Sequence, residues 1–369
     1  MNHKKSIKDS TVLVAPLDWG LGHATRCMHI INALLAANAR IIIAASGMQA
    51  GWLQQQYPSL KVLRIPGYKV RYAKRGVLLP WVLLQQLPRI IRTIKAEHRW
   101  LQQAVKKYNI DIVLSDNRYG LHTKQVPCIF ITHQLTIATP TAITTKIVQR
   151  INYCYIQQFS ACWVPDVRLT ANALAGTLSH PQQLPTIPVH YIGWLSRLQS
   201  IPQIANSAID FLVMLSGPEP QRTILETSVI KAAAAMPEKK FLLLRALPQA
   251  ATTLAVPDNV TAVNHADAAT ISAWVAQAEY IVTRSGYTTL MEVLPLGKRC
   301  ICIPTPGQTE QGYLATYLMQ RRWVFTVRQS QFSEAVLKAA LSFEFAVIPP
   351  STTIDIATLV AAHLAGETL

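Results

Sequence analysis

The chain has 369 residues, of which 50% are apolar and 15% are charged. This composition excludes a disordered chain, which needs low hydrophobicity and high charge, and the length is enough for about two domains. Lys and Arg outnumber Asp and Glu by 35 to 19, so the net charge is +16. Such a surplus indicates an anionic partner: nucleic acid, an anionic membrane surface or a phosphorylated small molecule.

Cysteine usage and the N-terminus indicate the compartment. No two of the six cysteines have Cys-x-x-Cys spacing, and Cys128, Cys300 and Cys302 lie in apolar runs, so we expect buried thiols in a reducing compartment and no zinc site. The N-terminus lacks the apolar core of a signal peptide, and the apolar run at 77–84 is far shorter than the ~20 residues that span a bilayer. We therefore expect a cytoplasmic protein that can lie on a membrane but not cross it.

Apolar runs of strand length alternate with helix-length segments in the first half of the chain. Strands are predicted at 11–17, 40–46, 109–115 and 127–133, with a helix over 24–37 after the first strand. The runs are continuous, which is typical of parallel strands buried on both faces. Their alternation with helices indicates right-handed strand–helix–strand units in a doubly wound sheet.

The same pattern restarts in the second half. Strands are predicted at 211–216, 241–246, 280–285 and 299–304, and a helix over about 220–235 follows the first of them. The sequence therefore predicts an α/β protein with two Rossmann-like, doubly wound domains.

A polar stretch without periodicity separates the two halves. We predict a first domain over 1–195, a linker over 196–207 and a second domain over 208–369. The final helix, predicted at about 353–365, could pack on either domain.

Most of the basic charge lies in one segment, 61–107. It holds twelve Lys and Arg residues and a single acid, Glu97, so it carries +11 of the total charge, and it includes the apolar run at 77–84 and Trp100. Basic and apolar residues in the same segment favour contact with an anionic membrane surface, although a solvated helix beside a core strand has a similar pattern. No nucleic-acid-binding motif accompanies it, so we expect no nucleic-acid partner.

The first candidate site is the loop at 18–26, directly after the first strand. Its glycines, Gly20 and Gly22, let the chain turn tightly beside a ligand, and His23 would lie at the sheet edge where open α/β folds bind ligands. An imidazole there can accept a proton at neutral pH. Asp116 and His133 each end a predicted strand on the same edge, so Asp116 could orient His23 or act as the base itself, and His133 is a third candidate.

The second candidate site is the strand-to-helix turn at 282–292. Arg284 beside the amides of Ser285, Gly286 and Thr288 at a helix start would form an anion site. Glu292 lies two turns into a mostly apolar helix, where it could bind the two hydroxyls of a ribose or simply face solvent.

Two more turns follow strands of the second half. Ser216 and Gly217, with Arg222, could present amides and a cation to a phosphate, or form an ordinary turn before a helix. Glu310 and Gln311 could hydrogen-bond the hydroxyls of a sugar or cap the next helix. Asp166 is interpreted as a turn or interdomain residue.

These motifs, in this order, resemble those of the GT-B glycosyltransferases, in particular family 28, over most of the chain. The loop at 20–23 is similar to the N-terminal glycine loop that ends in His, and Ser216-Gly217 is similar to the first glycine turn of the donor domain. The stretch from Arg284 to Glu292 resembles the Arg-Ala-Gly…Glu stretch whose Glu binds the donor ribose. The stretch at 310–315 resembles Gln-Gln-x-x-Asn-Ala near the donor sugar, with Glu310 replacing the first Gln and Leu314 the Asn.

The resemblance implies an inverting glycosyltransferase with two domains that face each other across a cleft. It implies a UDP-sugar donor carrying a hexose or N-acetylhexosamine, a lipid-linked or glycolipid acceptor, no cofactor and no metal. His23 would be the base, with Asp116 beside it, and Arg284 or Arg222 would offset the charge of the leaving diphosphate. The expected location is the inner face of the membrane, through residues 61–107.

Three other functions remain open. Gly-x-Gly-His-x-x-Arg-Cys, here from Gly20 to Cys27, also resembles a nucleotide-sugar hydrolase motif, in which water replaces the acceptor. A second function is that of a nucleotide-sugar epimerase, although the sequence contains no extra acidic pair that would support this activity. A non-catalytic nucleotide-sugar-binding or nucleic-acid-binding protein would use the same loops without turnover.

Overall fold

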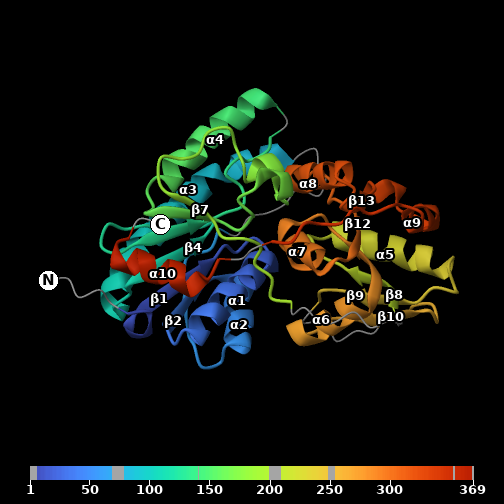
Figure 1. The fold of residues 1–369 in the computed structure, drawn as a ribbon, viewed down its shortest axis with the longest axis horizontal. Helices are drawn as coiled ribbons and strands as arrows, with labels where there is room; N and C mark the ends of the chain where they lie inside the picture. Colours follow the sequence, from blue (N-terminus) through green and yellow to red (C-terminus); the bar gives the residue numbers. More distant parts are fainter. Residues whose placement is uncertain are drawn as a thin grey trace. The chain divides into compact units, whose positions relative to one another are not determined.

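A computed structural model of the chain describes residues 6–68, 79–139, 141–198, 209–247, 254–351 and 354–367. The chain divides into two compact units (Figure 1). Unit 1 comprises 1–71, 81–195 and 351–369, and unit 2 comprises 72–80 and 196–350. The predicted linker is described only as far as Leu198, and the apolar run at 77–84 lies outside the residues whose side chains are described.

Unit 1 is built on a parallel sheet of seven strands in the order β3-β2-β1-β4-β5-β6-β7. The central strands are continuous apolar runs, and burial of both sheet faces explains why they show no alternation. The strands are β1 Thr11–Pro16, β2 Arg40–Ala45, β3 Lys61–Arg64, β4 Ile112–Asp116, β5 Cys128–Ile131, β6 Ala161–Val164 and β7 Val189–Tyr191.

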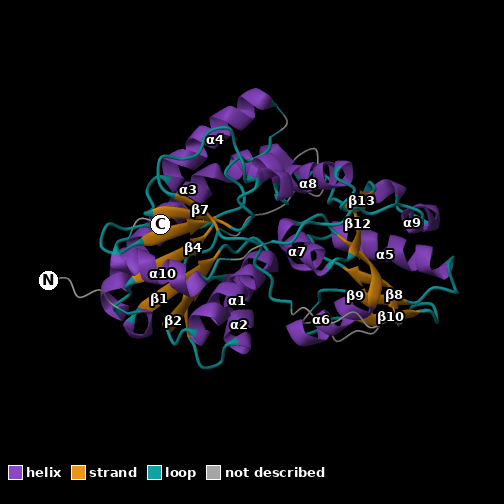
Figure 2. Ribbon diagram, viewed as in Figure 1, coloured by secondary structure: helices purple, strands orange, loops and turns teal. Residues whose placement is uncertain are grey.

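Helices pack on the sheet of unit 1 (Figure 2). Alternate residues of a strand point to opposite faces, so Leu13 and Ala15 of β1 share one core cluster with Leu101 of α3 and Ile156 of α4. The α-helices of this unit are α1 Leu21–Ala36, α2 Gly47–Gln56, α3 Leu79–Tyr108, α4 Ala142–Ile156 and α10 Ile356–Ala365, and short 3₁₀ turns lie at Ile7–Asp9, Thr170–Asn172 and Gly176–Leu178.

The last helix, α10, belongs to unit 1 although it follows the whole of unit 2 in sequence. It packs against α1, and the indole N–H of Trp163 on β6 donates to Nε2 of His363 at 3.2 Å. Just before the helix, the amide of Ile354 donates to the carbonyl of Ile192. These contacts hold the C-terminal helix to the first unit.

Unit 2 has a parallel sheet of six strands in the order β10-β9-β8-β11-β12-β13. Its core joins Phe211 and Val213 of β8 with Leu225 and Val229 of α5. The strands are β8 Ile209–Met214, β9 Phe241–Leu244, β10 Val260–Val263, β11 Ala278–Thr283, β12 Arg299–Cys302 and β13 Val324–Thr326. The helices are α5 Gln221–Ala234, α6 Ala268–Gln277, α7 Tyr287–Val293, α8 Thr309–Gln320 and α9 Glu334–Leu341, with 3₁₀ turns at Leu294–Leu296 and Gln329–Gln331.

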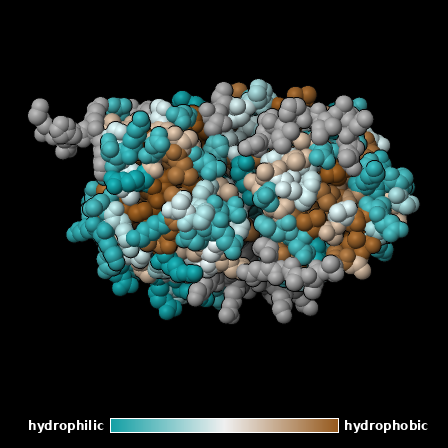
Figure 3. Space-filling model, turned by 90° about the horizontal axis from the view of Figure 1, so that it is seen from below, coloured by the Kyte–Doolittle hydropathy of each residue, from teal (hydrophilic) through white to brown (hydrophobic). Residues whose placement is uncertain are grey.

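The two parallel sheets confirm the predicted α/β class, because every predicted strand corresponds to one of them within a few residues. On the face of the molecule in Figure 3, hydrophilic residues surround smaller hydrophobic areas in each unit. In the described part of the chain, no helix is both long enough and apolar enough to cross a bilayer.

The docking of α10 is expected to weaken in acid. Burial, and then the neighbouring His190, lower the pKa of His363 to about 4, so the folded unit keeps a neutral imidazole that accepts the Trp163 N–H. The unfolded His protonates near its ordinary pKa of 6.5, so stability is full above that pH and is lost as the pH falls toward 4, by at most about 3 kcal/mol.

Hydrogen exchange of the α10 amides, corrected for intrinsic rates, measures this loss. His363→Gln is the control, because its amide oxygen can still accept from Trp163 and does not titrate. Equal pH dependence in the two proteins would contradict the prediction.

Candidate functional site

His23 and Asp116 meet at the carboxyl edge of the unit 1 sheet. Asp116 is the last residue of β4, which pairs with β1, and His23 lies in the first turn of the helix that follows β1. Nδ1 of His23 is 2.9 Å from Oδ2 of Asp116. The Asp116 side chain is fully buried and that of His23 is 18% exposed, so the pair has a buried carboxylate and an accessible imidazole.

Three further side chains surround the Asp116 carboxylate and its histidine. Arg26, also on α1, hydrogen-bonds Oδ1 of Asp116, and its other Nη atom lies 3.1 Å from Nδ1 of His133. Cys27 directs its thiol at Oδ2 of the same carboxylate at 3.8 Å. Burial, and then the Asp116 carboxylate, raise the pKa of this thiol, so it remains neutral and donates. Arg26 was not among the predicted site residues, although its position three residues after His23 places it on the same helix face.

The protonation of the pair follows from its charges. Burial by itself would raise the pKa of Asp116, but the Arg26 guanidinium and His23 outweigh it and hold the pKa below its ordinary value. An ionised carboxylate only accepts hydrogen bonds, so the proton between the two groups belongs to Nδ1 of His23. This tautomer leaves the lone pair on Nε2, the nitrogen that a general base needs. Arg26 Nη2 also lies 2.9 Å from Nδ1, and because a guanidinium only donates, this contact is a close approach and not a hydrogen bond in this tautomer.

Asp166 organises a loop within unit 1. Its buried carboxylate accepts hydrogen bonds from the backbone amides of Val167, Leu174 and Ala175, from the Ser179 hydroxyl and from the indole N–H of Trp194. The turn interpretation of this residue therefore agrees with the structure, and the interdomain one does not.

In unit 2, the turn after β8 brings polar groups around Gly217. This residue has a φ of 100°, a backbone conformation that side chains disfavour. A Cβ there would lie 3.5 Å from Oγ1 of Thr305 and 3.9 Å from Nε of Arg284. Both of these atoms are buried and have no hydrogen-bond partner in the described structure. The turn therefore lies beside two unused polar atoms. Gly217 and Arg284 were predicted from the sequence, whereas Thr305 was not.

The rest of the Arg284 guanidinium is already used. Its two Nη atoms donate to the carbonyls of Ile303 and Gln221, at 3.1 and 2.7 Å, and burial lowers its pKa to about 10. The expectation of an open cation at this turn is therefore wrong for the Nη atoms, because the side chain lies beneath the loops and joins them.

Arg222 is also occupied. It contacts Glu219 at 2.6 Å and Glu226 at 3.2 Å, and Glu226 in turn binds Arg245. Carboxylates balance its charge, so a phosphate would have to compete with them. The structure favours a structural role over the predicted phosphate contact.

Glu292 is buried rather than exposed to solvent. Its Oε1 accepts from Nε of Arg197 at 2.9 Å. Burial raises the pKa of Glu292 above its ordinary value, although Arg197 acts in the opposite direction. The simplest alternative, a solvated helix residue, is wrong because the carboxylate is only 3% exposed.

The remaining predicted residues shape the turns around β11 and β12. Ser285 donates to the carbonyl of Gln311 at 2.8 Å, and the Gln311 side chain accepts from the amide of Thr305 at 2.8 Å and donates to Gln308. Gly286 is the N-cap of the seven-residue helix α7. Thr288 and Glu310, on α7 and α8, are half-buried.

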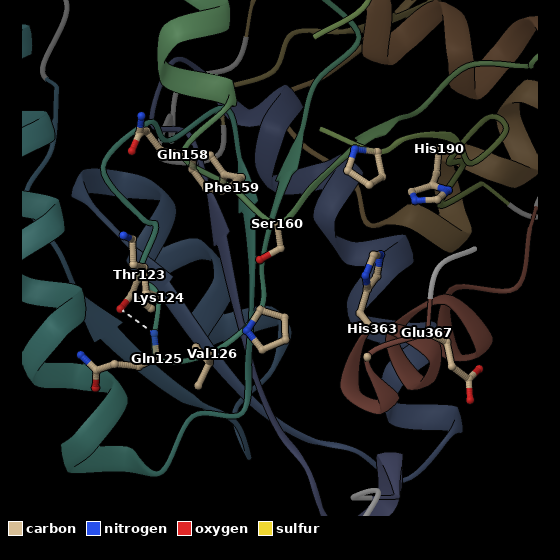
Figure 4. Close-up of a pocket in the computed structure, with 13 residues that line it drawn as sticks. Thr123, Lys124, Gln125, Val126, Gln158, Phe159, Ser160, His190, His363 and Glu367 are labelled. Carbon is tan, nitrogen blue, oxygen red and sulfur yellow. Dashed lines mark hydrogen bonds between the residues drawn. The ribbon is translucent and has the colours of Figure 1, made fainter. Parts of the chain in front are cut away.

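A cavity of about 570 Å³ lies at the other edge of the unit 1 sheet. Its walls come from the residues that precede β5, β6 and β7, with His190 and His363 on one side and Gln125 and Ser160 on the others (Figure 4). It therefore lies at the amino ends of the strands, whereas His23 and Asp116 lie at the carboxyl ends.

Two models of glycosyltransferase families match the chain. The model of the glycosyltransferase family 28 C-terminal domain matches residues 249–346, and the model of glycosyl transferase family 1 matches residues 15–188. Together the two matches span most of both units.

Solved glycosyltransferases have the same fold. The glycotransferase of kitacinnamycin superposes with a TM-score of 0.65 at 14% identity, covering 97% of this chain and 93% of that one. The spinosyn rhamnosyltransferase SpnG, complexed with thymidine diphosphate, has a TM-score of 0.62 at 14% identity and coverages of 96% and 95%. MurG of Acinetobacter baumannii has a TM-score of 0.55 at 12% identity and coverages of 97% and 95%.

The fold and the family matches define a glycosyltransferase of the GT-B class. The family matches support a family 28-like enzyme within that class, as the motifs predicted. No curated protein matches the sequence.

A structural role for Arg222 can be tested in solution. Arg222→Met is expected to lower the free energy of unfolding by about 1–3 kcal/mol, because two carboxylates lose a partner, and to change the affinity for UDP by less than about threefold. Urea denaturation and calorimetric titration measure the two effects. Arg299→Met, which removes an exposed ion pair of the same unit, is the control. A large loss of UDP affinity at unchanged stability would contradict the structural role and support the predicted contact of Arg222 with phosphate.

Proposed function

We propose that the protein is an inverting glycosyltransferase that moves a hexose or N-acetylhexosamine from a UDP-sugar to a lipid-linked or glycolipid acceptor. The observation that carries this proposal is the 2.9 Å hydrogen bond between His23 and the buried Asp116. It supplies an oriented general base with an accessible imidazole at the start of a helix, which a binding protein does not need.

The proposed reaction is a single displacement at the anomeric carbon. Nε2 of His23 takes the proton of an acceptor hydroxyl while the oxygen of that hydroxyl forms a bond to the anomeric carbon. The bond from that carbon to the diphosphate breaks on the opposite face, and UDP leaves with the electron pair, which inverts the configuration. Asp116 holds Nδ1–H and stabilises the imidazolium that forms, as the carboxylate of a catalytic triad does.

The donor diphosphate would bind at the Gly217 turn of unit 2. Gly217 lets a ligand come close to the backbone there, and Oγ1 of Thr305 and Nε of Arg284 are buried polar groups that have no partner among the described residues. The carboxylate of Glu292 would bind the ribose, as the family resemblance implies, after exchanging part of its contact with Arg197. The thymidine diphosphate bound to the spinosyn enzyme makes TDP the most informative competitor of UDP in a binding test.

A reciprocal pair of variants tests the proposed roles of His23 as the base and of Glu292 in nucleotide binding. His23→Ala is expected to lower turnover by roughly 10²–10⁴ and to leave UDP binding unchanged, because a general base acts only in the chemical step. Glu292→Ala is expected to weaken UDP binding. Calorimetric titration with UDP, TDP, ADP and GDP measures binding, and release of UDP from UDP-sugars, with and without membrane lipid extracts, measures turnover.

Each contrary outcome has a definite meaning. A folded protein that binds no nucleotide would refute both the transferase and the nucleotide-sugar hydrolase. UDP release at the same rate with and without acceptor lipids would identify the hydrolase.

The acceptor side of the proposal rests on the surface of α3 and α4. On α3, Leu87 and Ile91 are 44% and 42% exposed and lie among exposed basic residues. On α4, three isoleucines at a spacing of four were not predicted from the sequence: Ile143, Ile147 and Ile151 are 72%, 53% and 53% exposed. We call these five side chains the apolar stripe. Ile90 of α3 and Tyr155 of α4 pack against the same small core cluster, so the two helices are neighbours.

The charges around the apolar stripe have one sign. Lys146 and Arg150 on α4 are exposed, and no acidic residue occurs between Asp116 and Asp166. The only acid of α3, Glu97, is buried. Exposed isoleucines among cations suit the boundary between anionic head groups and acyl chains.

Vesicle binding tests the membrane surface. The double variant Ile143→Gln/Ile147→Gln is expected to lower partitioning onto vesicles of phosphatidylglycerol and phosphatidylcholine about tenfold or more, because burial of each isoleucine contributes on the order of 1 kcal/mol. Val347→Gln is the matched control, since Val347 is 91% exposed in unit 2. Cosedimentation measures the effect, and unchanged binding of the double variant would contradict the proposal.

A further inference from the structure

The guanidinium of Arg118 lies buried beneath the carboxyl edge of the unit 1 sheet. Its Nε donates to the carbonyl of Pro16 at 2.7 Å, its Nη1 to that of Pro66 at 3.0 Å and its Nη2 to Oγ of Ser46 at 2.8 Å. These acceptors end or follow β1, β3 and β2, and Arg118 itself follows β4. One fully buried side chain therefore ties together the ends of four adjacent strands.

Glu97 of α3 balances this charge. Its Oε1 lies 2.5 Å from Nη1 of Arg118, and its Oε2 accepts from the Tyr68 hydroxyl at 2.7 Å and from the amide of Gly120 at 3.2 Å. A Cβ on Gly120 would lie 2.3 Å from the carbonyl oxygen of Ile94, so α3 packs directly on the loop that carries Arg118.

Both residues of the His23–Asp116 pair are linked to this guanidinium through neighbouring residues. Asp116 is two residues before Arg118, and its register partner on β1 is Pro16, whose carbonyl Arg118 binds. On the other side, Ser46 accepts from Arg118 and donates to Oδ2 of Asp18 at 3.0 Å. Asp18 begins the loop that leads to His23.

Stability alone does not explain this arrangement. A buried ion pair loses about as much in desolvation as it gains in attraction, so apolar side chains of similar size would hold the sheet equally well. What an apolar pair cannot do is fix carbonyl and hydroxyl groups from four strand ends at defined distances, which the planar fork of donors on arginine does.

We propose that Arg118 is a positioning residue that sets the distance and orientation between His23 and Asp116, with Glu97 as its counter-charge. The inference rests on the proposed role of His23 as base. Misplacement of a base by about 1 Å can lower its rate by about 10². The side chains that carry the proposal are Asp18, Ser46, Glu97 and Arg118.

The tautomer of His23 gives a direct test that needs neither donor nor acceptor. Nitrogen chemical shifts of labelled histidines, with the His23 signals assigned through His23→Gln, report which ring nitrogen carries the proton. Arg118→Lys keeps a cation beside Glu97 but cannot reach all of its acceptors at once. It is expected to raise the fraction of the Nε2–H tautomer of His23.

Two further variants keep the test decisive. Ser46→Ala breaks the link to Asp18 with little change in packing, so it is expected to shift the same signals in the same direction by less, and it serves if Arg118→Lys does not fold. Arg245→Lys makes the same change at a buried arginine that pairs with Glu226 in unit 2, and is expected to leave the His23 signals unchanged. In turnover, Arg118→Lys should lower kcat at least about tenfold with KM for the donor unchanged.

Failure of this inference is distinct from failure of the proposed function. If Arg118→Lys and Ser46→Ala leave the His23 signals in place, while Arg118→Lys loses as much stability as Arg245→Lys, the Arg118 cluster is a structural ion pair only. If the His23 signals of the unaltered protein show Nε2–H as the main form, the proposed base is wrong, whatever the variants do.

Discussion

The structure around the candidate site depends on one constraint: the Asp116 carboxylate is completely buried and must be compensated. Arg26 supplies the charge, while His23 and Cys27 supply further hydrogen-bond donors. All three lie in the first two turns of α1, so the helix can compensate the carboxylate only in one rotation about its axis. That same rotation leaves the imidazole of His23 on an accessible side of the helix. A requirement of folding thus fixes the geometry that general-base chemistry would use.

The second unit handles its buried charges differently. Glu226 binds both Arg222 and Arg245, and Glu292 binds Arg197, so most ions there compensate one another. Nε of Arg284 and Oγ1 of Thr305, in contrast, are buried at the Gly217 turn and have no partner among the described residues. Because unused buried polar atoms carry a cost, their position beside a turn that follows a parallel strand makes this the best-supported ligand position of the unit.

Pairing in the interior leaves the exposed surface of α3 entirely basic in its charges. Glu97, the only acid of the long helix α3, pairs with Arg118 in the interior, so it does not offset the exposed cations of that helix. The apolar stripe on α3 and α4 lies among these cations. Interior pairing and surface character are therefore linked through the same helix.

Much of the fold could be predicted from the sequence, because continuous apolar runs by themselves indicate parallel strands. Glycine-containing turns after those strands indicate the edge of the sheet where ligands bind. His23 and Asp116 were predictable as candidates since both end or follow strands that meet at that edge. Only the tertiary structure decided three contacts: the hydrogen bond between His23 and Asp116, the bond of Arg26 to Asp116, and the bonds of Arg118 to the ends of neighbouring strands. Each joins residues many positions apart, and whether they meet depends on the order of the strands. The burial of Glu292 has the same cause, because its partner Arg197 is distant in the sequence. The pairing of Arg222 differs, because Glu219 and Glu226 are only three and four residues away, so the sequence already placed these charges near each other. A sequence shows that a charge is present, and only the packed structure decides whether that charge is buried and already neutralised by another.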